Sequence, residues 1–359
     1  MQTFESSNDS SKYFNESELP SVASKYYTAS EERTMRRRTC RFLEEACRVL
    51  KLSRIAASTS MVFFHRFYAC HSFKDHDRFE VALGCILLAS KTEESPRRLT
   101  SVIQECYKLK HTSSSSRKNQ SAEPSSSTNT AASTISNGYL DVKGQEFARI
   151  KERTLLLERI ILHTIGFDLS IHHPYKDLYT TIPLLVSQSQ IEYIQPSKTN
   201  ATGSSNTISD GINNCSRELL QSAMNFANDS MHTSLCLQYP PRIIALVCIY
   251  MSGVYCQMRP TKHSSWIQLL QSLPFDDTTL GSEEENQIDM YKCANIAIQI
   301  MELISDKKDL NKDKFKAVET DLEALKKEYL TTGGGRTDST GNSTAMDGDT
   351  RHKRPRMAM

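Results

Sequence analysis

The sequence lacks a hydrophobic run long enough to cross a bilayer, and it lacks an excess of either charge. Its most apolar segments, 81–89 and 243–251, are much shorter than the roughly 20 residues that a transmembrane helix needs. Lys and Arg number 44 against 42 Asp and Glu, so the net charge is only +2. The electrostatic field of so small a net charge does not favour binding to nucleic acid or to a membrane. The polar N-terminus has no apolar signal region, so we do not expect secretion.

Cysteine is well represented, but no two cysteines are spaced as C-x-x-C, although the chain has ten. We expect them to be small buried residues in a reducing compartment, because they fall in apolar, helix-like segments. A disulfide framework or a zinc site would need a different spacing. The cysteines that carry this interpretation are Cys40, Cys47, Cys70, Cys85, Cys106, Cys236, Cys248 and Cys293.

The residue groups of an enzyme active site are also missing. The clustered histidines are not spaced with carboxylates as a catalytic or metal-binding set would be. We interpret them as core or surface side chains, and we expect no catalytic residue, no metal and no cofactor. These histidines are His65, His71, His76, His172 and His173.

Hydrophobic residues make up 38% of the chain, which is low for a wholly globular protein. Polar stretches account for this value. Residues 112–142 are rich in Ser, Thr, Asn and Ala, and they cannot bury enough apolar surface to offset the entropy lost on ordering. We predict a disordered insertion there and a second polar insertion at 195–214. We also predict a flexible N-terminal segment at 1–30 and a disordered tail at 331–359.

The sequence does contain a helix without a polar face. Between Val81 and Ala89 nearly every residue is apolar, and the small residues Ala82 and Gly84 are interspersed. A surface helix keeps a polar side, so we expect this helix to be enclosed by neighbours at the centre of a helical bundle. The charged residues 90–94 follow at the point where the helix reaches solvent.

Four further helices are predicted around this central helix by apolar residues at helical spacing. Ser53 is placed to cap the second of them. The basic run 36–38 lies in the first, where we favour a solvated helix face over contact with phosphate. The expected ranges are 31–50, 53–70, 99–109 and 146–165.

The arrangement recurs in the second half of the chain. An all-apolar helix at 243–251 begins after Pro240 and Pro241, with proline at its first turn. Two bundles with buried central helices in matching places indicate an internal structural repeat. We predict an all-α fold of two five-helix repeats, at 31–169 and 170–305. The other helices are expected at 174–187, with a kink or an end at Pro183, at 217–237, and at 283–304, with Ser282 and Glu285 as a capping box.

Several motifs carry a resemblance to a known family. HRFY at 65–68, LLASKTEE at 87–94 and LERIILHTIGFDL at 157–169 resemble a cyclin box in order and spacing, apart from the serine-rich insertion. HSFKDHDRF at 71–79, HHPY at 172–175 and FANDSMHTSLCLQYPPRIIA at 226–245 are similar to transcriptional cyclins of the cyclin K and cyclin T type. The resemblance covers about residues 31–304 without the insertions, and it implies the same two repeats as the helical periodicity.

The resemblance implies a regulatory subunit and not an enzyme. Its expected partner is the catalytic subunit of a cyclin-dependent kinase, in a heterodimer. That complex would phosphorylate the C-terminal domain of RNA polymerase II in the nucleus and promote transcription elongation. Direct binding to nucleic acid or to a membrane is not expected.

The family holds its kinase through a lysine at the end of the central helix and a glutamate in the fifth helix. The matching residues are Lys91 and Glu158, and the apolar positions around them match Leu88, Leu162, Phe167 and Leu169. A lysine suits this role because it can donate to carboxylate and carbonyl groups of a partner. The alternatives stay open at this point: an intramolecular ion pair for the two charges, and ordinary core positions for the four apolar residues.

One departure from the wider family separates this chain from cell-cycle cyclins. Those proteins dock substrates through an MRxxL motif and a tryptophan in the first helix, whereas here Met35 and Arg36 are followed by Thr39 and the helix has no tryptophan.

The alternative function is a cyclin-fold general transcription factor that binds DNA and polymerase directly. That class would usually show a zinc ribbon and strongly basic repeats, which this sequence lacks.

Two features follow the second repeat. Residues 306–330 are expected to hold an amphipathic helix, whose apolar stripe we expect to pack on this chain's own second repeat in preference to a kinase or a second copy. The stripe consists of Phe315, Val318, Leu322, Leu325 and Tyr329.

The tail carries a basic cluster that we interpret as a nuclear import signal, against the alternative of a solvated terminus. Its residues are Arg351, Lys353, Arg354 and Arg356.

Overall fold

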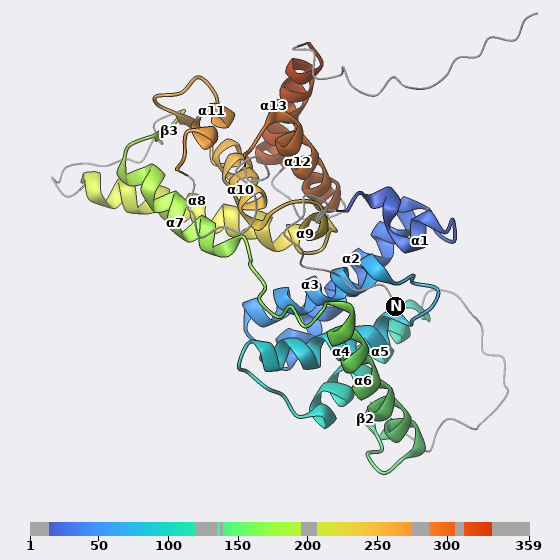
Figure 1. Cartoon of the computed structure of the whole chain (residues 1–359). Coiled ribbons are helices and arrows are strands. Elements are labelled where there is room, and N and C mark those ends of the chain that lie inside the picture. Colours follow the sequence, from blue (N-terminus) through green and yellow to red (C-terminus); the bar gives the residue numbers. More distant parts are fainter. Residues whose placement is uncertain are drawn as a thin grey trace, which may run out of the picture.

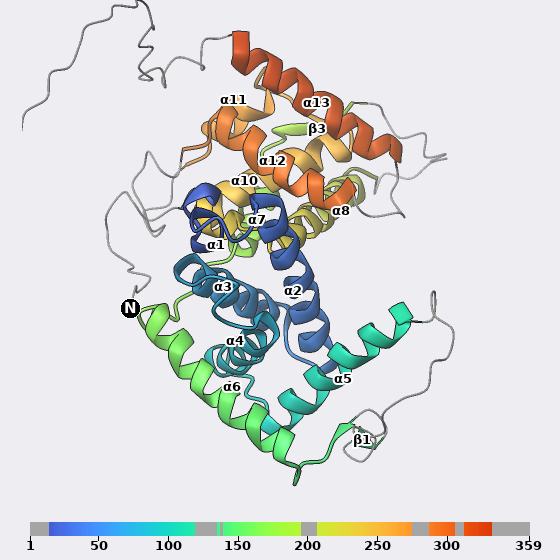
Figure 2. The same cartoon turned by 90° about the vertical axis from the view of Figure 1, so that its right-hand side faces the viewer.

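A computed structural model describes residues 14–118, 135–136, 139–194, 207–274, 287–305 and 312–331. This part of the chain forms thirteen α-helices, one short 3-10 helix and two small antiparallel sheets. Figures 1 and 2 show the helices as two bundles, one above the other. The all-α class and the two five-helix repeats expected from the sequence are confirmed.

The first bundle surrounds helix α4 (Arg78–Thr92), which contacts each of the other four helices. Every residue from Val81 to Ser90 is buried, so the helix has no solvent-facing side in its middle. Its N-terminus is capped by the Asp77 carboxylate, which accepts the backbone N–H groups of Phe79 and Glu80. The surrounding helices are α2 (Ala29–Val49), α3 (Arg54–Cys70), α5 (Leu99–Lys118) and α6 (Gln145–Thr164).

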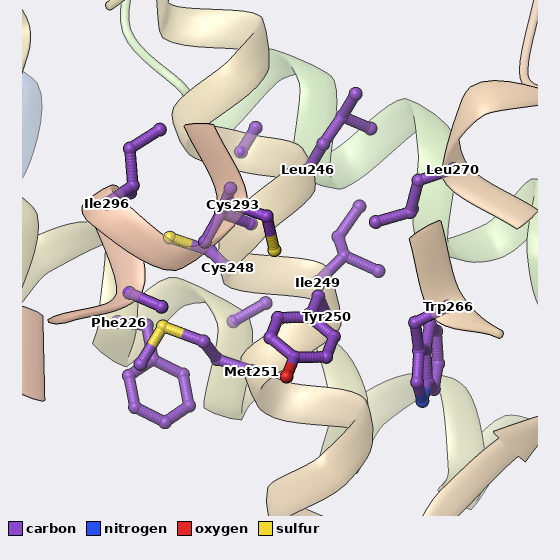
Figure 3. Packing of buried hydrophobic residues seen from close by; sticks show 14 of the residues in the cluster. Phe226, Leu246, Cys248, Ile249, Tyr250, Met251, Trp266, Leu270, Cys293 and Ile296 are labelled. Atoms are coloured by element: carbon purple, nitrogen blue, oxygen red, sulfur yellow. The ribbon is translucent and has the colours of Figure 1, made fainter. Parts of the chain in front are cut away.

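The second bundle surrounds helix α10 (Pro241–Tyr255), which is buried from Ile243 to Gly253. Figure 3 shows its side chains meeting those of the neighbouring helices, with the ring of Trp266 beside α10. A Cβ atom on Gly253 would lie 2.1 Å from the Trp266 ring, so only glycine allows this contact. The other four helices of this repeat are α7 (Tyr175–Ser187), α8 (Thr207–Ser230), α11 (Trp266–Gln271) and α12 (Met290–Ser305), and the single-turn helix α9 (Leu235–Gln238) connects α8 to α10.

Several predicted boundaries differ from the structure at the polar segments. Helix α5 continues through its serines to Lys118 and α8 begins at Thr207, because a formed helix extends at little cost even through residues of moderate propensity. Strand β1 (Ile135–Ser136) pairs with β2 (Tyr139–Leu140) inside the predicted insertion at 112–142. Strand β3 (Ile191–Tyr193) pairs with β4 (Met258–Pro260), which the sequence did not predict. The remaining parts of the two insertions, at 119–134, 137–138 and 195–206, and the tail at 332–359 lie outside the described residues.

Three helix predictions in the second repeat need correction. Pro183 does not end α7, because the buried residues Ile182 and Leu185 hold the helix on the core on both sides of it. The helix expected at 217–237 is two helices, separated at 231–234. The helix expected from residue 283 begins at Met290, and the proposed capping residues Ser282 and Glu285 lie outside the described residues.

The N-terminal segment is ordered from residue 14, in contrast to the flexible segment predicted for 1–30. A 3-10 helix (Glu16–Glu18) and α1 (Pro20–Ala23) follow one another, and Leu19 between them is buried. The Phe14 N–H donates to the Leu237 carbonyl of the second repeat at 2.8 Å. The Ser21 hydroxyl accepts the Phe73 N–H of the first repeat at 3.0 Å. The segment therefore ties the two repeats together. Residues 1–13 lie outside the described residues.

Arg36 is fully buried, which corrects the prediction that run 36–38 is a solvated face. Its Nε donates to Glu32 at 2.6 Å, and its other nitrogens donate to the Nδ1 of His65 at 3.0 Å and to the carbonyl of Tyr68 at 3.0 Å. A buried guanidinium is tolerated only when its donors are satisfied in this way. Glu32 lies on α2, whereas His65 and Tyr68 lie on α3. The apolar pattern of α2 alone cannot show that α3 supplies partners for Arg36.

His65 joins this network to the second repeat. Because its Nδ1 accepts from Arg36, its proton lies on Nε2, which donates to the Met231 carbonyl at 3.0 Å. A second proton, on Nδ1, would make the ring a cation and place two buried cations side by side. Burial, with a smaller contribution from Arg36, lowers the pKa of His65 from 6.5 to about 3.

We expect stability to fall as the pH is lowered from 7 to 5. The unfolded chain binds a proton at His65 near pH 6.5, whereas the folded chain excludes it until about pH 3. The free energy of unfolding therefore falls as the pH drops from 6.5 toward 3. At pH 5 this one group has lowered it by roughly 2 kcal/mol. Urea unfolding at both pH values measures the loss. His65→Gln, although less stable overall, should lose less between pH 7 and 5, and an equal loss would contradict the assignment.

Helix α13 (Lys312–Thr331) lies across the second bundle, at the far end from the first (Figure 2). Val318, Leu322 and Leu325 are buried against the second core, and α13 contacts both α10 and α12. The Tyr250 hydroxyl of α10 donates to Asp321 of α13. Four of the five residues of the apolar stripe, Phe315, Val318, Leu322 and Leu325, therefore meet a surface of their own chain, and the Tyr329 side chain lies outside the described ones.

Leu322→Asp should lower the free energy of unfolding by about 3 kcal/mol or more, because it places a charge in the second core and removes apolar contacts. Ala324→Asp is the matched control, since Ala324 is exposed on the same helix and receives the same charge. Thermal and urea unfolding of both variants would be compared. If Leu322→Asp melts like Ala324→Asp, α13 does not contribute to the folded domain.

Candidate functional site

Helices α4 and α6 approach closely at Gly84. A Cβ atom there would lie 2.8 Å from the Ile161 Cδ1 atom and 3.4 Å from the Glu158 backbone nitrogen. The missing side chain brings the two helices together, and it places the C-terminal turn of α4 beside the middle of α6. This contact positions the two charged residues singled out in the sequence.

Lys91 and Glu158 form an ion pair across this contact, with 2.6 Å between Nζ and Oε1. The Lys91 side chain is 52% exposed, whereas that of Glu158 is 9% exposed. The structure therefore brings the two predicted residues together as an intramolecular pair. A pair with one exposed partner contributes little stability, on the order of 1 kcal/mol or less. Its chemical importance lies in the fixed position of a lysine that still faces solvent.

Exposed apolar side chains lie along the same helix and beyond its end. Phe167 is 59% exposed and Leu169 is 36% exposed, while Leu162 on α6 is half-buried. Leu88, in contrast, is 4% exposed and packs in the first core. In this chain it therefore occupies a core position, the alternative that the sequence left open, because other helices enclose α4 there.

Sequence reasoning missed Leu155, which is 40% exposed. It shares a face of α6 with Glu158 and Leu162, at positions i, i+3 and i+7. The signal was present in the run Leu155–Leu157, because three consecutive leucines cannot all face one core. Leu157 is the residue that points inward, with no exposed surface. We call Lys91, Leu155, Glu158, Leu162, Phe167 and Leu169 the α6 surface.

Two successive left-handed residues end α6 and present Phe167 to solvent. Gly166 has φ 62° and Phe167 has φ 60°. This conformation costs about 1 kcal/mol or more for a residue with a side chain, so neighbouring contacts must hold it. The Phe167 N–H donates to the Leu162 carbonyl at 3.0 Å, and Asp168 pairs with Arg66 of α3 at 3.1 Å. These contacts hold the Phe167 side chain in a fixed, exposed position at the end of α6.

The tip of α4 is also tied to the segment that leads into the second repeat. The Thr59 hydroxyl of α3 donates to Glu93 at 2.7 Å and accepts from the Nε2 of His173 at 2.9 Å. Burial lowers the pKa of His173 from 6.5 to about 4, so the ring is neutral. These contacts fix the end of the central helix that carries Lys91.

In the part of the chain that the structure describes, no three His, Cys, Asp or Glu side chains gather as metal ligands would, and no helix is both long and apolar enough to span a bilayer. The ten cysteines are free. Most are buried, and burial raises the pKa of the Cys47 thiol to about 11. The α6 surface is therefore the candidate functional site.

The fold and the α6 surface together define a two-repeat helical protein with a fixed lysine–glutamate pair on its first repeat. Comparison with protein families agrees with this class. Residues 9–170 match the N-terminal domain of cyclins, and residues 207–272 match the C-terminal domain of the Cyclin-T2-like type. The chain therefore belongs to the cyclin family.

Curated relatives support the resemblance to cyclins K and T. Cyclin-K of Homo sapiens is 30% identical over 252 residues, which cover 68% of this chain and 34% of that protein. Cyclin-K of Danio rerio is 31% identical, over 68% of this chain and 47% of that protein. Cyclin-T1-3 of Oryza sativa subsp. japonica is 31% identical, over 64% and 37%. The chain thus spans about a third to a half of the length of these relatives.

A solved structure shares the fold. A chain in the crystal structure of the yeast RNA Pol II CTD kinase CTDK-1 complex superposes with a TM-score of 0.51, covering 90% of this chain and 83% of that chain. The sequences are 14% identical, so this likeness speaks for the fold alone.

Proposed function

We propose that this chain is the regulatory subunit of a cyclin-dependent kinase and that the α6 surface binds the catalytic subunit. The observation that carries the proposal is the exposed apolar surface around the Lys91–Glu158 pair. Leu155 and Phe167 are exposed by 40% and 59%; Leu155 lies one turn before Glu158 on α6, Phe167 follows the end of that helix, and the nearly buried Glu158 carboxylate holds Lys91. Apolar anchors around a preorganised charge are typical of a specific protein interface.

The lysine can serve the partner while it keeps its intramolecular bond. An ammonium group has three donors, and Glu158 accepts one of them. The remaining N–H groups can donate to carbonyl or carboxylate groups of a kinase segment laid across the surface. Glu158 reduces the entropy cost of that contact, because it already holds Lys91 in place.

The proposed mechanism is allosteric, and the chain supplies no catalytic group. In an inactive kinase, a mobile helix is turned away, and the lysine–glutamate pair that orients ATP is broken. A surface that binds the inward position of that helix better than the outward one shifts the equilibrium toward the active state. The rigid setting of the α6 surface, between the α4 tip and the turn at Gly166, suits this role.

The kinase substrate in this proposal is the C-terminal domain of RNA polymerase II, and its phosphorylation promotes elongation in the nucleus. The support is the similarity to cyclins K and T1, together with the motifs described in the sequence. A kinase assay on polymerase C-terminal repeats with the purified complex tests this part separately from kinase binding.

A charge swap tests whether Lys91 acts on the partner or only on Glu158. Lys91→Glu should weaken kinase association about 100-fold, since it places like charges together and removes a donor at a desolvated contact. The double variant K91E/E158K should recover the thermal stability of the domain but not the kinase affinity. Titration of the kinase subunit against each variant measures the affinity.

Two further variants sharpen the result. Phe167→Ala should weaken kinase association while the melting temperature stays unchanged, because the ring is mostly exposed. Lys316→Glu is the charge control, on exposed α13 surface. Full recovery of affinity in K91E/E158K would show that the pair has only an intramolecular role, and the proposed contact would then be wrong.

Nuclear entry is proposed to depend on the basic tail cluster, which lies outside the described residues. Replacing Arg351, Lys353, Arg354 and Arg356 with alanine should leave the folded domain intact and shift the protein to the cytoplasm, because an import receptor binds extended basic segments. Fluorescence microscopy in cells without the kinase partner measures the distribution. Undiminished nuclear accumulation would remove this role from the cluster.

A further inference from the structure

A second surface of the first repeat combines cations with aromatic rings. In Figure 2, α2 and α5 lie to the right of this bundle, whereas α6 runs along its left side. The rings of Phe42 on α2 and Phe79 on α4 meet edge to face, with centroids 5.3 Å apart. The Arg78 guanidinium lies 5.0 Å from the Phe79 ring centroid, and the Lys110 ammonium lies 4.8 Å from it. Both rings are half-buried.

Two more arginines extend this surface along α2. Arg38 and Arg41 are exposed, and they precede Phe42 on one face of the helix at a spacing of i, i+3 and i+4. Within residues 36–38, Arg36 is buried and Arg37 pairs with Glu302 of α12 at 3.6 Å. Arg38 is the exposed arginine of the three. We call Arg38, Arg41, Phe42, Arg78, Phe79 and Lys110 the basic–aromatic surface.

The carboxylates near this surface are engaged elsewhere. Glu45, on the same face of α2, accepts two hydrogen bonds from Arg48, at 2.9 and 2.5 Å. Asp77 caps α4. Within the described residues, no carboxylate lies within 4.0 Å of the guanidinium groups of Arg38, Arg41 or Arg78. Arg38 and Arg41 are exposed and Arg78 is half-buried, and none of the three forms an ion pair with a described residue beside this aromatic pair.

We propose that the basic–aromatic surface binds an acidic peptide segment of a partner protein, with Asp or Glu side chains on both sides of an apolar residue. Guanidinium groups bind carboxylates in a bidentate way, and the apolar residue would cover Phe42 and Phe79. The four cations come from three helices, α2, α4 and α5, which suits several carboxylates along a peptide better than a single phosphate. Arg78 and Lys110 lie over the Phe79 ring, so a nucleic-acid base could stack there only by displacing them.

This proposal does not rest on the kinase surface, and its test needs no kinase. The full chain would be titrated into a fluorescent peptide with glutamates flanking a central phenylalanine, and anisotropy would report binding. Arg38→Glu with Arg41→Glu should weaken binding about tenfold or more. Arg217→Glu with Lys316→Glu is the charge-matched control, since Arg217 is exposed on α8 and Lys316 on α13, and it should bind like the unaltered chain. Thermal melting would verify that both double variants fold.

The peptide's central residue tests the aromatic part of the surface. Replacing its phenylalanine with serine should weaken binding to the unaltered chain and change binding to Phe79→Ala much less. The proposal is overturned if the two double variants weaken binding equally, since the attraction would then be non-specific. It is also overturned if single-stranded RNA or a phosphoserine peptide without carboxylates binds more tightly than the acidic peptide. Loss of kinase binding in Lys91→Glu with peptide binding intact would separate the two surfaces.

Discussion

Both bundles depend on burying one helix completely. α4 and α10 have no polar side in their middle sections, so each is stable only when other helices enclose it. The enclosing helices must come close, and glycine makes this possible in both cases: Gly84 faces α6, and Gly253 faces Trp266. A buried helix can reach solvent only at its ends, and one end of α4 carries Lys91.

The two repeats are joined by the apolar side chain of Met231, which is buried in the first core, and by polar contacts, which fix direction as well as distance. His65 reaches the Met231 carbonyl, and His232 pairs with Glu44 of α2 at 3.1 Å. The hydrogen bond from His232, with further contributions from Arg54, lowers the pKa of Glu44 to about 2. Because hydrogen bonds are strict in geometry, the repeats meet in one orientation, and the α6 surface keeps a fixed relation to the second repeat.

The sequence was informative wherever a local pattern decides the structure. The central helices followed from the absence of a polar face, and the Lys91–Glu158 pair followed from the family motif. Arg36 was misjudged because its partners His65 and Tyr68 lie on another helix, which the pattern of α2 cannot indicate. Leu155 was missed and the core alternative for Leu88 stayed open for a related reason: both are apolar at helical spacing, and only the packing of α4 on α6 decides which of them faces solvent.

Helix α13 makes the two repeats unequal. It contacts α10 and α12, which are the central and fifth helices of the second repeat. The corresponding pair in the first repeat, α4 and α6, carries the α6 surface. The duplicated architecture could have offered two such faces, but the chain covers the second with its own C-terminal helix. Under the proposed function, one chain therefore presents a single face of this kind to a catalytic subunit, and the duplication adds no second one.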